Sequence, residues 1–139
     1  MNTDSSADHD LLTRTIASQA LFTGLAPASL ARLVSAARMM RHAAGDILIR
    51  ENSVNDRLFL IVDGEARVDS NGTMIGRLAA GDLAGEISSA GISPPVATVQ
   101  ADSELQTLSF PALLIAEIAG HDAVFARRLR QAAFQRISG

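Results

Sequence analysis

The residues of this chain that could do chemistry are few, and their spacing excludes most kinds of active site. Its three histidines, His9, His42 and His121, stand far apart, and none belongs to a His-x-His or His-Glu-x-x-His pattern, so a metal site is not expected. The pair Ser88-Ser89 has no histidine or lysine beside it that could act as a base. The sequence therefore predicts a protein that is not an enzyme and holds no metal.

Two residue types are missing altogether, and each absence removes a kind of chemistry. Without cysteine the chain can form no disulfide, iron–sulfur cluster, thiolate zinc site or nucleophilic thiol. Without lysine it has no Schiff-base nucleophile and no phosphate-loop lysine. Because cysteine-free composition fits the reducing cytosol, we expect a cytoplasmic location.

Charge is distributed unevenly along the chain. Residues 78–126 contain six acidic residues and no basic one, whereas residues 127–139 contain four arginines. Arginines on one helix more often form a solvated face than a nucleic-acid surface, and nothing here matches a base-reading module. No apolar run approaches the roughly 20 residues that cross a bilayer. We therefore expect neither direct DNA binding nor membrane insertion.

Helical spacing of apolar residues predicts helices toward both ends of the chain. A short helix is expected over residues 11–21, and the apolar stripe within 30–37 predicts a second helix, which Pro27 can open. Near the other end, Pro111 can lie in the first turn of a helix that Gly120 ends, and Asp122 can cap a final helix.

Between these helices, short apolar runs separated by turn residues predict strands. The pair Asn71-Gly72 can supply the positive φ angles of a two-residue hairpin. The expected strands cover residues 47–49, 57–62, 66–68, 74–75, 96–101 and 105–110. Short, regularly spaced strands with glycine-rich turns predict a mainly β chain with flanking helices, built as an antiparallel sandwich or roll.

Four motifs in order make the chain resemble the cyclic-nucleotide-binding domain family. They read LFTGL at 21–25, GDIL at 45–48, LFLIVDGEA at 58–66 and GDLAGEI at 81–87. The resemblance implies an antiparallel β-roll domain over residues 20–139. Within it, 20–44 would be a helical lead-in, 45–110 the roll and 111–139 the C-terminal helices. Residues 1–19 would then be a frayed tail with a short helix.

One departure from the family pattern lies in a turn. Where the family usually has two glycines after an early strand, this chain has Asn52 and Asn55. Asparagine is the non-glycine residue that best tolerates the left-handed region, so we expect the turn geometry to survive.

The resemblance also implies a ligand site, in which a strand, a short helix and a loop hold a cyclic phosphate. Gly85 would let the backbone approach the ligand, and Glu86 would accept a hydrogen bond from the ribose 2′-hydroxyl. The free N–H groups of the helix after Glu86 would face the phosphate. The residues expected to contact the ligand are Gly85, Glu86, Ile87, Ser88, Val96 and Ala97.

The far end of this loop departs from the family. Pro95 stands where the family places the arginine that pairs with the phosphate, and Val96 where it places a small or hydroxyl residue. Proline offers no donor and valine only its backbone N–H. We therefore expect binding of cAMP or cGMP to be weakened, altered or lost, unless Arg77, Arg127 or Arg128 replaces the missing charge.

These expectations leave two functions open. The first is a regulatory sensor module that transmits its state through the final helix, which in the family moves against the roll and often forms a homodimer. The second is a ligand-free scaffold or adaptor that binds a partner protein through the C-terminal helix, where Phe134 lies off the apolar face. No residue points to a larger anionic messenger such as a cyclic dinucleotide.

Overall fold

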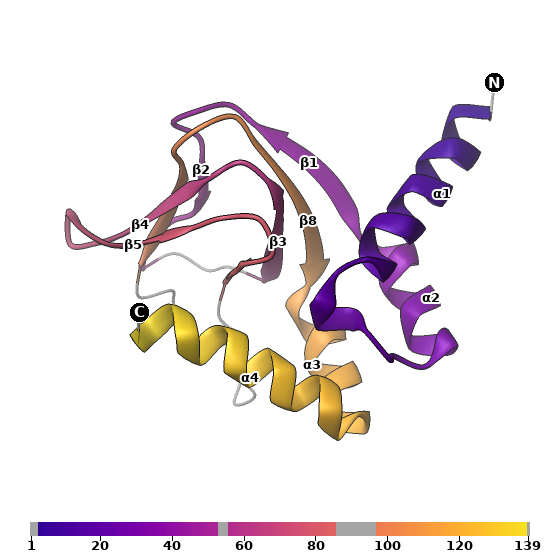
Figure 1. Cartoon of the computed structure of the whole chain (residues 1–139). Helices are drawn as coiled ribbons and strands as arrows, with labels where there is room; N and C mark the ends of the chain where they lie inside the picture. The colour runs from indigo at the N-terminus through magenta and orange to yellow at the C-terminus, as the bar shows by residue number, and fades with distance from the viewer. Residues whose placement is uncertain (1–2, 53–55, 86–96, 139) are drawn as a thin grey trace.

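The computed structural model of the chain describes residues 3–52, 56–85 and 97–138. Its strands form two four-stranded antiparallel sheets, and helices from both ends of the chain pack together beside one of them (Figure 1). We call the sheet with the strand order β1-β8-β3-β6 sheet A and the sheet with the order β2-β7-β4-β5 sheet B. The predicted mainly β architecture, an antiparallel roll with flanking helices, is confirmed.

Both sheets are built from short strands. Sheet A consists of β1 (Arg38–His42), β8 (Leu105–Pro111), β3 (Arg57–Asp63) and β6 (Leu83–Ala84). Sheet B consists of β2 (Ile47–Ile49), β7 (Thr98–Ala101), β4 (Ala66–Ser70) and β5 (Thr73–Leu78). The helices are α1 (Thr3–Ala17), the 3₁₀ helix η1 (Ala20–Phe22), α2 (Pro27–Ala36), α3 (Ala112–His121) and α4 (Ala123–Ser138).

Sheet A is buried on both faces, which explains why β3 reads as an unbroken apolar run rather than an alternating one. On one face Leu58 and Leu60 belong to a cluster that the helices complete with residues such as Ile16. On the other face Phe59 and Ile61 belong to a cluster that they share with sheet B. Sheet A is therefore the central layer, and it joins the helices to the roll.

The predicted turns have the expected backbone chemistry. Asn71 and Gly72 have φ angles of 53° and 82°, as the tight hairpin between β4 and β5 requires. Asn52 has a φ of 64°, which confirms the prediction for that position, whereas Asn55 lies outside the described residues. The β4–β5 pairing shifts register between Val68 and Asp69, so β5 carries a bulge near its exposed end.

Two turns share the sequence Ala-Ala-Gly-Asp, at 43–46 and 79–82. In each, the aspartate N–H donates to the carbonyl of the first alanine, and the aspartate carboxylate accepts that alanine's N–H, at 2.9 Å for Asp46 and 2.8 Å for Asp82. Each turn leads directly toward an apolar strand. The aspartates thus fix the points at which β2 and β6 begin.

Several elements differ from the sequence predictions. Helix α1 begins at Thr3 rather than near residue 11, so residues 3–10 are helical instead of frayed. Strand β1 lies within the predicted helical lead-in and was not expected, because its residues include no β-branched side chain; pairing with β8 decides its conformation. Pro111 ends β8 and precedes α3 instead of lying in its first turn, and α3 continues through Gly120 to His121, so Gly120 does not end the helix as predicted.

Candidate functional site

The predicted ligand segment joins the two sheets. Gly85 follows β6 of sheet A, and Ala97 precedes β7 of sheet B, so the chain must cross from one sheet to the other between them. Gly85 has a φ of 120°, a backbone conformation that side-chain-bearing residues rarely adopt. Glu86, Ile87, Ser88 and Val96 lie outside the described residues, as does Pro95.

The strands that hold the two ends of this segment are fixed by neighbouring backbone. Phe59 pairs with Ala84, and the N–H of Ile61 donates to the carbonyl of Asp82 at 2.9 Å, so β6 is bound to β3 up to the residue before Gly85. On the other side, β7 lies between β2 and β4. The segment 85–97 therefore starts and ends on supported strands.

The roll interior beside the segment is apolar. The buried cluster shared by the sheets contains Ile49, Phe59, Ile61, Ala66, Leu78, Ala84, Val99, Ala101 and Leu105, with Leu48 and Val68 packed against it. None of these side chains carries a charge. Within the described part of the chain, this cluster therefore offers no group that could neutralise a phosphate.

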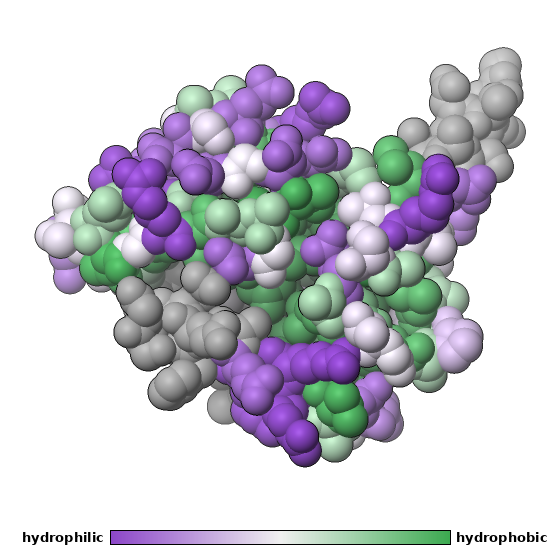
Figure 2. Space-filling model, in the orientation of Figure 1, coloured by the Kyte–Doolittle hydropathy of each residue, from purple (hydrophilic) through white to green (hydrophobic). Residues whose placement is uncertain are grey.

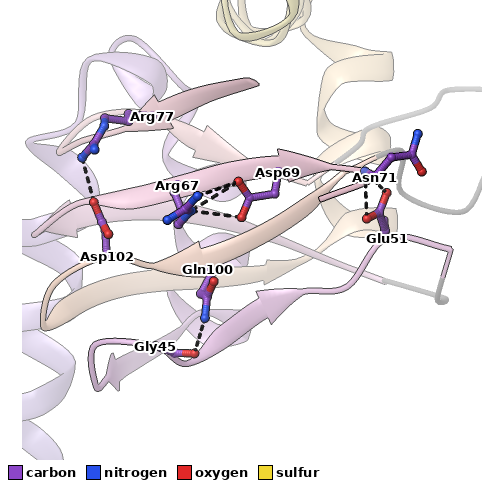
Figure 3. A network of polar contacts seen from close by, with 8 residues as sticks. All are labelled: Gly45, Glu51, Arg67, Asp69, Asn71, Arg77, Gln100 and Asp102. Carbon is purple, nitrogen blue, oxygen red and sulfur yellow. Dashed lines mark hydrogen bonds and ion pairs between the residues drawn. The ribbon is translucent and has the colours of Figure 1, made fainter. Parts of the chain in front are cut away.

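Polar contacts tie the turn after β2 to the rest of sheet B (Figure 3). The Glu51 carboxylate accepts the N–H of Asn71 at 3.2 and 3.3 Å, which holds the turn against the β4–β5 hairpin. The Glu51 N–H in turn donates to the Thr98 hydroxyl at 3.1 Å, one residue beyond Ala97. These contacts were not expected from the sequence, because they join residues that are far apart along the chain.

Two of the three arginines considered as substitutes for the missing charge contact other groups. Arg77 forms an ion pair with Asp102 at 2.7 Å (Figure 3). Because the next residue, Leu78, faces the roll interior, Arg77 points away from it. Arg128 donates to the carbonyl of Thr23 in the N-terminal region, and Arg127 is exposed on α4.

Helix α4 is anchored on the N-terminal segment. The ring of Phe22 in η1 stacks on Phe125 of α4 at 5.9 Å between centroids and meets Phe110 of β8 edge-on at 5.4 Å. The predicted cap is present, since the Asp122 carboxylate accepts the N–H of Phe125 at 3.0 Å.

Hydrophilic residues cover the outer side of the roll and the lower surface over α4, with apolar surface between them (Figure 2).

The N-terminal and C-terminal helices are also joined by an ion pair. Arg32 of α2 and Glu117 of α3 meet through two hydrogen bonds of 2.9 and 3.2 Å. The hydrogen bonds and charge of Arg32 lower the pKa of the Glu117 carboxyl. The pair therefore links α2 to α3 at the surface.

His42 is a structural residue in this fold. It is buried, and its Nε2 lies 3.0 Å from the Thr107 hydroxyl, with the ring edge-on to Phe59. Burial lowers the pKa of its imidazole, while the nearby Asp46 opposes that effect. Over the described ranges, no group of three histidine, aspartate or glutamate side chains is placed to hold a metal ion.

The fold and the sequence motifs together define the class of the molecule. The model of the cyclic nucleotide-binding domain family matches residues 39–122, which is more than half of the chain. The chain therefore belongs to the cyclic nucleotide-binding domain family, whose domain is a regulatory β-roll.

Known proteins agree with this assignment. The chain is 31% identical over 124 residues to a cyclic nucleotide-gated potassium channel of Rhizobium etli, covering 89% of the chain and 35% of the channel. It is 34% identical over 82 residues to the cGMP-dependent protein kinase egl-4 of Caenorhabditis elegans, covering 59% of the chain and 10% of the kinase. The chain thus spans at most about a third of these two relatives.

Solved structures show the same fold. The regulatory subunit of a cAMP-independent protein kinase A from Trypanosoma brucei superimposes with a TM-score of 0.77 at 19% identity, over 93% of this chain and 49% of that one.

Within the described residues, no helix of this chain has the length and apolar character needed to span a membrane.

Proposed function

We propose that this chain is a non-catalytic sensor module that binds cAMP or cGMP weakly, because Pro95 stands where the family has its phosphate-pairing arginine. The segment that would cradle the ligand runs from Gly85 through Glu86, Ile87 and Ser88 to Val96 and Ala97. Glu86 would hold the ribose, and backbone N–H groups would take over part of the phosphate binding. Such a module would act in the cytoplasm.

The observation that supports this proposal is the position of two of the three candidate substitute arginines, since the third, Arg127, is exposed on α4. Arg77 is paired with Asp102 on the side away from the roll interior, and Arg128 contacts Thr23. Neither is therefore available near the apolar cluster without breaking an existing contact. With six acidic residues and no basic one in 78–126, the surrounding field also repels an anion.

The output of the module would be the position of α4. The contacts of Phe125 and Arg128 with the N-terminal segment hold α4 in one place, and a ligand that favours another position of α4 would shift the balance between the two states. A homodimer or a partner protein would then receive the change through α4.

The test is isothermal titration calorimetry with cAMP and then cGMP, a method that suits a chain without tryptophan or tyrosine. For the wild type we expect a dissociation constant well above about 10 μM. Pro95→Arg should tighten binding by a factor of about 30 or more, since the restored pair is worth roughly 2–5 kcal/mol. Pro94→Arg is the matched control, because it adds the same charge one position away.

The outcomes separate the alternatives. Wild-type binding at or below about 10 μM would refute the claim that Pro95 weakens the site. No heat with either nucleotide at millimolar concentration, for the wild type and for Pro95→Arg, would favour the adaptor function. That second candidate is supported by an exposed face of α4, on which Val124, Arg127 and Gln131 recur at helical spacing.

A further inference from the structure

A second surface with binding chemistry lies on sheet A, apart from the segment 85–97. In β1, β8 and β3, Arg38, Ser109 and Phe59 stand opposite one another, so they point to the same face of the sheet. Arg57 lies two residues before Phe59 and shares that face. Around Phe59 this face is buried against sheet B. Arg38 on the same face is exposed, so sheet B does not cover the part of the face that carries Arg38.

Arg57 is held rigidly on this surface. Its Nε donates to the Ser109 hydroxyl at 2.9 Å and its Nη2 donates to the Ser109 carbonyl at 3.1 Å. Ser109 is fully buried, and its hydroxyl donates to the Met40 sulfur at 3.6 Å. A guanidinium positioned by two hydrogen bonds loses little further side-chain entropy when it binds a ligand.

The two arginines lie close enough to repel each other. Burial and the charge of Arg38 lower the pKa of Arg57, while Asp56 opposes both effects. Among the side chains that the structure describes, those of residues 9–52, 56–85 and 97–131, none forms an ion pair or a side-chain hydrogen bond with Arg38. An anion placed between the two guanidinium groups would remove this repulsion and would gain charge-assisted hydrogen bonds.

An exposed methionine and a helix start lie beside the arginines. Met40 lies two residues after Arg38 on the same face of β1 and is 37% exposed. Helix α3 begins just after Pro111, the residue that pairs with Arg57, and its first turn contains no acidic residue. The positive end of the helix dipole therefore adds to the field of the arginines.

We propose that the surface formed by Arg38, Met40 and Arg57 is a docking site for an acidic, partly apolar segment of a partner protein. Carboxylates of the segment would pair with the two guanidinium groups, and an apolar side chain beside them would contact Met40. A nucleic acid fits less well, because the surface carries only two arginines and the whole chain has a net charge of −3. This site acts independently of cyclic-nucleotide binding.

The experiment is an NMR titration of the ¹⁵N-labelled chain of residues 1–139 with a short capped peptide rich in glutamate and leucine. We expect the largest shifts at the backbone amides of β1, β3 and the start of α3. Arg38→Gln should weaken binding by roughly tenfold, the usual effect of losing one well-placed charge at an interface. Arg41→Gln is the matched control, since Arg41 lies on the same strand but on the other face.

Further variants make the result decisive. Ser109→Ala should weaken binding by leaving Arg57 without its hydroxyl acceptor, and a melting temperature recorded for each variant separates this effect from unfolding. The exposed Arg38 provides the variant least able to disturb the fold. Absence of binding at millimolar peptide, equal losses for Arg38→Gln and Arg41→Gln, or equal binding of the glutamine version of the peptide would each overturn the proposal. Titration with cAMP should give the same result for all these variants and the wild type.

Discussion

Replacing Gly64 by alanine should destabilise this fold more than the same change at any turn glycine with open surroundings. Gly64 follows β3 and has a φ of 95°. A Cβ added there would lie 2.3 Å from the Glu104 carbonyl oxygen and 3.0 Å from the Leu105 Cα. Both contacts are with backbone, and Leu105 is itself buried in the roll, so neither neighbour can move cheaply.

The expected magnitude has two parts. Holding alanine at a positive φ costs about 1–2 kcal/mol, and forcing packed backbone apart costs about 1–3 kcal/mol more. The free energy of unfolding should therefore fall by about 2–5 kcal/mol. For a chain of this size, that loss lowers the melting temperature by roughly 10 °C.

Gly45→Ala is the control that isolates the steric part. Gly45 has a φ of 96°, nearly the same as Gly64, but a Cβ added there meets nothing within 4 Å. It should cost only the strain of about 1–2 kcal/mol. Thermal and urea denaturation followed by far-ultraviolet circular dichroism measure both variants. If the two variants lose equal stability, the contact with Glu104 does not have the effect assigned to it.

Three further predictions follow from individual contacts. Burial lowers the pKa of the His42 imidazole, so the unfolded chain takes up a proton at a higher pH than the folded chain does. The free energy of unfolding should therefore fall as the pH drops below about 6.5. In His42→Gln, the melting temperature should depend less on pH between about pH 8 and pH 5. Asp122→Ala removes the cap of α4 and should cost about 1 kcal/mol in urea denaturation, whereas a loss below a few tenths would show that the cap is redundant. In Arg32→Gln, the pKa of the Glu117 carboxyl, followed by NMR, should rise toward its ordinary value, and an unchanged pKa would show that the pair does not persist in solution.

Local chemistry made several features of the fold predictable from the sequence. The pair Asn71-Gly72 forms the predicted hairpin, Asn52 adopts the left-handed conformation, and Asp122 caps α4. Pro27 opens α2 as predicted. Each of these depends on residues within about four positions of one another, so the information lies in a short stretch of sequence.

Strand β1 shows where such local information fails. Its residues lack the β-branched side chains that are typical of strands, and the preceding helical pattern continues up to Ala37. Only pairing with β8, more than sixty residues further along the chain, holds Arg38–His42 extended. The contact of His42 with Thr107 follows from the same pairing, and the Arg57–Ser109 contact follows from the equally long-range pairing of β3 with β8.

For the candidate ligand site, too, some features were predictable from the sequence and others depended on the tertiary structure. Four motifs in order, the last of which contains Gly85, predicted the family from the sequence, and the effect of Pro95 on affinity is a prediction that calorimetry tests. The partners of the arginines could not be read from the sequence, because Arg77 meets Asp102, and Arg128 meets Thr23, only after distant segments have folded together. By itself, the sequence determined the turns, the caps and the family. The tertiary structure alone decided which charges face each other, since charge pairing depends on distance in space rather than on separation along the chain.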